Sequence, residues 1–98
     1  MRVIAIGDKI FVNAFRLVGA EGVEVSSPQE MLEELRRAIA SGDVGLVLLS
    51  DEMASQVRRE LAIIKGKHAV PLIYELPSPG SSPKEVDYME MVKEMMSA

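Results

Sequence analysis

The chain has 98 residues, of which 48% are hydrophobic, so it can form one small folded domain, and extended disorder is not expected. Its net charge of −4 argues against nucleic acid as the main partner, because binding to phosphates needs a basic surface. The absence of cysteine excludes disulfides and cysteine-based zinc sites and fits a reducing cytoplasm, and no apolar run approaches the roughly 20 residues that span a bilayer.

The N-terminal quarter predicts a strand, a helix and a second, short strand. Residues 2–6 are rich in the β-branched side chains that strands favour. Asp8 is a suitable N-cap for a helix over about 9–18, and Gly19 follows the expected end of that helix. The second strand is expected at 23–25.

The middle of the chain predicts a well-capped helix followed by a buried strand. Ser27 and Glu30 have the spacing of a capping box, with a helix expected over about 28–40 and Gly42 after it. Residues 44–49 form a continuous apolar run, which is typical of a central parallel strand covered on both faces.

A third helix and a fourth strand complete the alternation. Ser50 is the expected N-cap of one helix whose apolar stripe extends over 53–64 and which Gly66 ends. The fourth strand is expected at 69–74. Pro71 within it indicates an edge position or a late start of its hydrogen bonding, because proline has no N–H to donate.

This order of elements predicts an α/β fold with a four-stranded parallel sheet. We expect a Rossmann- or flavodoxin-like arrangement with strand order 2-1-3-4 and helices on both faces. The sheet domain is expected over 1–76, followed by a Pro/Gly/Ser linker at 77–82 and an amphipathic C-terminal helix at 83–98.

The predicted C-terminal helix has one apolar face that needs a partner surface. A helix of about 14 residues is not stable alone in water, so this face must pack either on the sheet domain or on another protein. Methionine repacks easily, which favours an interface with a partner. The residues of this candidate partner interface share one face by their spacing: Tyr88, Met91, Val92, Met95 and Met96.

The carboxyl ends of the strands are the expected ligand-binding edge of such a sheet. Asp8 and Asp51 lie there, so a receiver-like signalling domain that binds Mg²⁺ and a phosphoryl group is an alternative interpretation. However, Asp8 has no acidic neighbour, and no lysine follows the last strand. Asp51 and Glu52 are explained more simply as first-turn residues that interact favourably with a helix dipole.

No other motif predicts catalysis or cofactor binding. The turn Gly7-Asp8-Lys9 lacks the further glycines of a dinucleotide or phosphate loop, which disfavours a nucleotide-binding flavodoxin-like domain. His68 is the only histidine, and no serine lies in a nucleophile elbow. We therefore expect no catalytic residue, no metal ligand and no cofactor.

A run of basic residues surrounds the end of the third predicted helix. It consists of Arg58, Arg59, Lys65, Lys67 and His68. The simpler interpretation is a solvated helix face, and the alternative is a docking surface for an acidic partner helix.

The first part of the chain resembles the F subunits of archaeal and bacterial A/V-type ATP synthases. In that family an apolar strand is followed by Gly-Asp and then by a Gly-Phe-x-Leu-Ala-Gly motif, in which this chain has Ala14 and Val18 at the first glycine and the alanine. Its length, the order of its elements and a Leu-Pro-Ser sequence after the fourth strand are also similar. The residues that match the family motif are Gly7, Asp8, Phe15, Arg16, Leu17 and Gly19.

The resemblance implies a non-catalytic component of the central stalk, or rotor, of a V-type ATPase or ATP synthase. Such a component would bind the coiled-coil D subunit of the stalk, with the face of the C-terminal helix as the candidate contact and the catalytic head as a second partner of that helix. It would contribute to rotational coupling and to the regulation of ATP hydrolysis and synthesis with proton or sodium transport. It would be cytoplasmic and peripheral to the membrane, with no membrane insertion and no nucleic acid partner.

Overall fold

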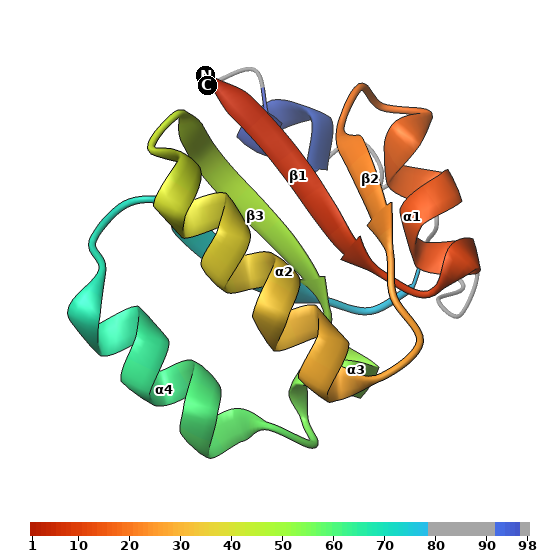
Figure 1. Ribbon diagram of the computed structural model, residues 1–98. Helices are drawn as coiled ribbons and strands as arrows, with labels where there is room; N and C mark the ends of the chain where they lie inside the picture. The colour runs from red at the N-terminus through yellow and green to blue at the C-terminus, as the bar shows by residue number, and fades with distance from the viewer. Residues whose placement is uncertain (79–91, 97–98) are drawn as a thin grey trace.

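Four parallel strands form one sheet in the computed structural model (Figure 1). The strands are β1 (Arg2–Gly7), β2 (Glu21–Glu24), β3 (Val44–Ser50) and β4 (Leu72–Leu76), and their order across the sheet is β2-β1-β3-β4. All three neighbouring pairs are parallel. The predicted fold class and strand order are confirmed. The structure describes residues 1–78 and 92–96.

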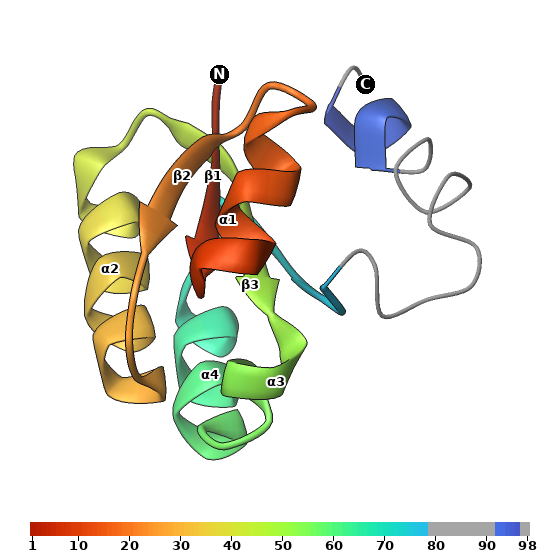
Figure 2. The same ribbon diagram turned by 90° about the vertical axis from the view of Figure 1, so that its right-hand side faces the viewer.

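Helices cover both faces of the sheet and produce three layers (Figure 2). One face, here called the α2 face, is covered by α2 (Pro28–Ser41) and α4 (Arg58–Lys67), with the single turn α3 (Asp51–Ala54) at its edge. The opposite face, the α1 face, is covered by α1 (Lys9–Arg16) and a C-terminal helix at 92–96. Among the described residues, no helix has both the length and the apolar composition that spanning a membrane requires.

The first helix begins as predicted and ends earlier. The Asp8 carboxylate accepts a hydrogen bond from the Phe11 backbone N–H at 2.9 Å and so caps α1. The helix ends at Arg16, and Gly19 adopts a φ of +101°, which glycine reaches without strain. This early turn lets β2 start at Glu21, two residues before the predicted position, where Glu21 is the register partner of Ile4.

The capping box of α2 is confirmed with one small difference. The Ser27 hydroxyl accepts a hydrogen bond from the Glu30 N–H at 3.1 Å. The Glu30 carboxylate accepts one from the N–H of Ser26, the residue before the cap, at 2.9 Å. Gly42 ends the helix in a left-handed conformation with φ of +79°.

The prediction of one continuous third helix is wrong. The helix is interrupted between α3 and α4, where Val57 adopts φ −134° and ψ 36°. The hydroxyl of Ser55 donates to the Glu52 carbonyl at 2.8 Å, a local side-chain bond that competes with helix formation. Ser50 provides no side-chain cap, and Gly66 lies inside α4 rather than after it.

The fourth strand lies at the edge of the sheet and starts late, as Pro71 indicates. Hydrogen-bonded pairing with β3 begins at Leu72, so the strand lies later in the chain than the predicted 69–74. The peptide bond between Val70 and Pro71 is cis. Most of the predicted linker at 77–82 and of the predicted helix at 83–98 lies outside the described residues, so those boundaries stay predictions.

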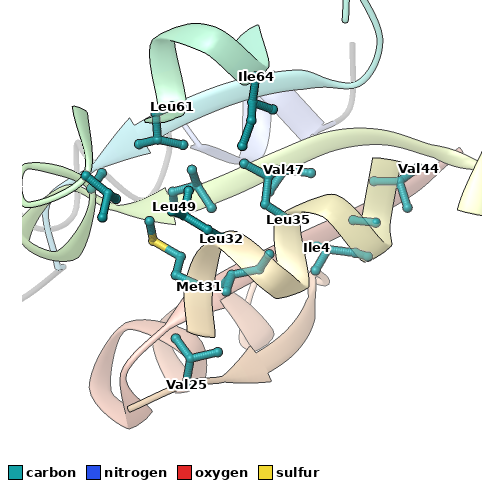
Figure 3. Packing of buried hydrophobic residues seen from close by; sticks show 14 residues of the cluster. Ile4, Val25, Met31, Leu32, Leu35, Val44, Val47, Leu49, Leu61 and Ile64 are labelled. Atoms are coloured by element: carbon teal, nitrogen blue, oxygen red, sulfur yellow. The ribbon is translucent and has the colours of Figure 1, made fainter. Parts of the chain in front are cut away.

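The side chains of β3 point alternately to the two faces of the sheet, and each face has its own part of the core. On the α2 face, Val47 and Leu49 pack with side chains of α2 and α4 (Figure 3). On the α1 face, Leu46 and Leu48 pack in a second cluster that includes side chains of α1. This second cluster is the surface on which the C-terminal helix lies.

Candidate functional site

Polar residues at the carboxyl edge of the sheet have structural roles. Asp8 caps α1, Ser50 is only 2% exposed, and Asp51 lies in the first turn of α3. Within residues 1–78 and 92–96, no group of three or more His, Cys, Asp or Glu side chains is placed to hold a metal ion.

Glu75 at the same edge links β4 to α4. Its carboxylate lies 2.6 Å from the Lys65 ammonium and 3.8 Å from the Arg58 guanidinium. Two members of the predicted basic run are thus ion-paired to a strand of their own domain. Lys67 and His68 belong to a different surface, which they share with residues of α2.

The C-terminal helix presents its predicted apolar face to the sheet domain. Val92 is fully buried, and Met95 and Met96 are half-buried against the α1-face cluster, whereas Lys93 and Glu94 are exposed. The inward residues are spaced i, i+3 and i+4, which is one side of a helix. The other two residues of the predicted interface, Tyr88 and Met91, lie outside the described residues.

The surface that receives this helix comes from α1, three strands and the α1–β2 connection. A pair of aromatic rings lies within it: the centroids of Phe11 and Phe15 are 4.6 Å apart, with the rings tilted by 55°. The Cε atom of Met96 reaches to 4.0 Å from the Cβ position of a side chain on Gly19. The buried members of the surface are Ala5, Phe11, Val12, Phe15, Ala20, Leu46, Leu48 and Leu76.

Most of this receiving surface was not among the predicted site residues. Leu46, Leu48 and Leu76 are strand residues whose importance depends on which face they occupy. The continuous apolar run at 44–49 contains the necessary signal, because alternate residues of a strand point to opposite faces. The sequence alone does not say which of the two faces the C-terminal helix covers.

The family-motif residues build the connection from β1 through α1 to β2. Phe15 is buried, and the Arg16 guanidinium donates to the Asn13 side-chain oxygen at 3.3 Å and to the Gly22 carbonyl at 3.2 Å. Leu17, in contrast, is 84% exposed. The motif is therefore largely a packing motif, with one apolar side chain left at the surface.

Comparison with known proteins agrees with this fold and with the sequence resemblance. The family model described as "ATP synthase (F/14-kDa) subunit" matches residues 3–95. A curated protein, the F subunit of the A-type ATP synthase of Methanothermobacter thermautotrophicus, is 30% identical over 87 residues, which cover 87% of this chain and 81% of that protein. The match extends through β1 to β4 and into the C-terminal helix, so the chain belongs to the family of ATP synthase (F/14-kDa) subunits.

Proposed function

We propose that this subunit of an A/V-type ATP synthase is a non-catalytic component of the central stalk that binds the coiled-coil D subunit. In this role it contributes to rotational coupling and to the regulation of ATP hydrolysis and synthesis. Two findings support the proposal: the family match over residues 3–95, and a relative named as the F subunit of an A-type ATP synthase. We also propose that it lies on the cytoplasmic side as a peripheral part of the complex.

The shallow packing of the C-terminal helix is the observation that carries the regulatory part of the proposal. One buried valine and two half-buried methionines contribute about 4 kcal/mol by burial. Because few side chains among its described residues are buried, a partner that binds the apolar face of this helix more tightly could shift it from the α1 face.

We therefore propose that the C-terminal helix exchanges between two positions. In one, Val92, Met95 and Met96 pack on the α1 face, and in the other they contact the D subunit. The predicted interface would extend to Tyr88 and Met91. The catalytic head is a second contact of the released helix in this proposal, as the family resemblance implies.

Met95→Asp tests the contact with the D subunit. A carboxylate in an apolar interface carries a large desolvation penalty, so co-purification of the variant with that partner should weaken at least tenfold. Lys93→Asp is the matched control, because Lys93 lies on the exposed side of the same helix. If Met95→Asp binds the partner as well as the wild type does, the helix is not the contact.

A further inference from the structure

A groove on the α2 face, away from the C-terminal helix, has no role in the proposed function. It lies between α2 and α4, which are side by side on the same face of the sheet (Figure 1), and encloses about 440 Å³. We call it the α2–α4 groove. Its apolar lining is Ile39, Ala40, Ile63 and Ile64, and its basic lining is Arg36, Lys67 and His68.

The apolar lining of the groove is only partly used by the domain itself. Ile64 is buried and points into the core (Figure 3), and Ile39 packs against the edge of the same cluster. Ile63, one residue before Ile64, is 53% exposed. An exposed isoleucine beside a hollow between two helices provides apolar surface that a partner side chain could bury.

The basic lining contrasts with the acidic character of the whole chain. Arg58 and Lys65 of α4 are paired with Glu75, but in the described part of the chain neither Arg36 nor Lys67 lies within 4.0 Å of a carboxylate. His68 adds a hydrogen-bonding imidazole at the end of α4, and the lining also includes Glu60. The groove thus offers two unneutralised cations beside apolar surface in a chain of net charge −4.

The dimensions suit a helix rather than an extended peptide. The part of α4 that lines the groove runs from Glu60 to Lys67, a rise of about 10 Å, or two helical turns. The groove between two neighbouring helices can bind a third helix. The side chains that enter the groove form a ridge on that third helix and are spaced i, i+3 or i+4, and i+7. The residues that line the α2–α4 groove include none from the described strands, so an extended peptide would find no strand edge there with which to pair.

We propose that the α2–α4 groove binds an amphipathic helix of another subunit of the synthase, one with carboxylates flanking an apolar ridge. The ridge would cover Ile63, and the carboxylates would pair with Arg36 and Lys67. This contact lies on the opposite face of the sheet from the C-terminal helix, so both surfaces can be occupied at once. It does not depend on exchange of that helix.

Two synthetic helical peptides test the charge requirement. Both carry the same leucine ridge, flanked in one by glutamates and in the other by lysines, and fluorescence anisotropy measures binding to the full chain. The glutamate peptide should bind at least tenfold more tightly. The double variant Arg36→Glu/Lys67→Glu should reverse that preference, whereas Arg59→Glu, an exposed residue of α4 outside the lining, should preserve it. Equal affinities for the two peptides, or no binding, would overturn the proposal.

Cysteine labelling tests occupancy in the assembled synthase. Because the chain has no cysteine, Ala40→Cys places a single thiol in the groove lining, and Ala62→Cys places one on α4 outside it. Both alanines are exposed in the chain by itself. Assembly should slow maleimide labelling at Ala40→Cys at least tenfold relative to Ala62→Cys. Equal rates at the two positions would show an empty groove and refute the proposal.

A second copy of this chain is the alternative occupant of the α2–α4 groove. If sedimentation shows that the isolated chain dimerises and Ile63→Glu makes it monomeric, the groove binds a second copy of the chain, and the proposal is wrong. A monomeric chain that still binds the glutamate peptide supports it. Since Ile63 is exposed, this substitution leaves the core intact.

Discussion

At the scale of single residues, the Gly7-Asp8 turn joins β1 to α1 through two contacts with Phe11. The Asp8 carboxylate accepts the Phe11 N–H, and a Cβ atom on Gly7 would lie only 2.7 Å from the Phe11 ring. Phe11 is fully buried. The glycine of this family motif is therefore explained by packing rather than by ligand binding.

Gly7→Ala should consequently destabilise the fold. An extra methyl group forced against a buried ring should lower the free energy of unfolding by about 1–3 kcal/mol. Unfolding in urea measures this change. Gly66→Ala is the control, because Gly66 lies in α4 with nothing within 4 Å of its Cβ position. That substitution should stabilise by about 0.5–1 kcal/mol. A neutral Gly7→Ala would show that Phe11 can shift.

Arg2 joins two carboxylates at the other end of the sheet. It lies 2.8 Å from Glu21 and 2.9 Å from Asp43. The hydrogen bond from Arg2 holds the pKa of Glu21 below its ordinary 4.5. The pKa of Asp43 is held below its ordinary 3.8 by the hydroxyl of Ser41 and then by Arg2.

These lowered pKa values predict an acid-sensitive contribution to stability. Both carboxylates hold their protons less tightly in the folded state than in the unfolded state. They therefore stabilise the fold above their ordinary pKa values and lose this effect as the pH falls through the lowered ones. In Arg2→Gln, the unfolding free energy should fall less steeply than in the wild type between about pH 5 and about pH 2. Parallel pH profiles would exclude this role of Arg2.

At the scale of elements, the C-terminal helix depends on residues at the ends of other elements. Leu76, the last residue of β4, is buried in the α1-face cluster together with Val92. Shortening Leu76 would weaken the surface under the helix without changing the helix itself. In the proposed exchange, the balance between the docked and the released helix would therefore depend on the sheet domain as well as on the helix.

Leu76→Ala should therefore tighten binding to the D subunit if the helix must leave the α1 face first. The loss of a buried leucine destabilises by up to about 2–5 kcal/mol, and part of this loss falls on the docked state alone. Leu61→Ala is the matched control, because Leu61 is buried in the α2-face cluster. Calorimetry should show higher affinity only for Leu76→Ala. Equal effects of both variants would point to global stability instead.

At the scale of the whole molecule, the α2 face forms its core without the C-terminal helix. Its buried cluster draws on residues from Ile4 to Ile64, all within the sheet domain. The helix at 92–96 contributes only to the opposite face. Loss of the tail would thus expose part of one face and leave the other intact.

Deletion of residues 83–98 should accordingly leave a folded sheet domain with altered ATPase regulation. Circular dichroism should retain the α/β signature with a lower melting temperature, because Val92, Met95 and Met96 no longer cover the α1 face. ATP hydrolysis by the reconstituted synthase should then differ in its regulation from the wild type. Wild-type regulation in the truncated enzyme would argue against a regulatory role of the tail.

The sequence by itself determined most of the elements and their order across the sheet. Asp8 and the pair Ser27 and Glu30 are local caps whose hydrogen bonds reach only a few residues, so they can be recognised without knowing the fold. Strands alternating with helices leave few permissible topologies, which is why the order β2-β1-β3-β4 could be predicted. The apolar spacing of Val92, Met95 and Met96 also follows from the helical period alone.

Only the tertiary structure decided where the third predicted helix is interrupted and which surfaces its basic residues occupy. The interruption at Val57, which is buried beside Leu61, contradicts a helical stripe that the local sequence supports. The basic run is divided because Glu75, from a distant strand, pairs with Arg58 and Lys65, while Lys67 lines a groove with Arg36. Contacts between residues far apart in the chain set these outcomes, and a local pattern contains no information about which distant residue will be its neighbour.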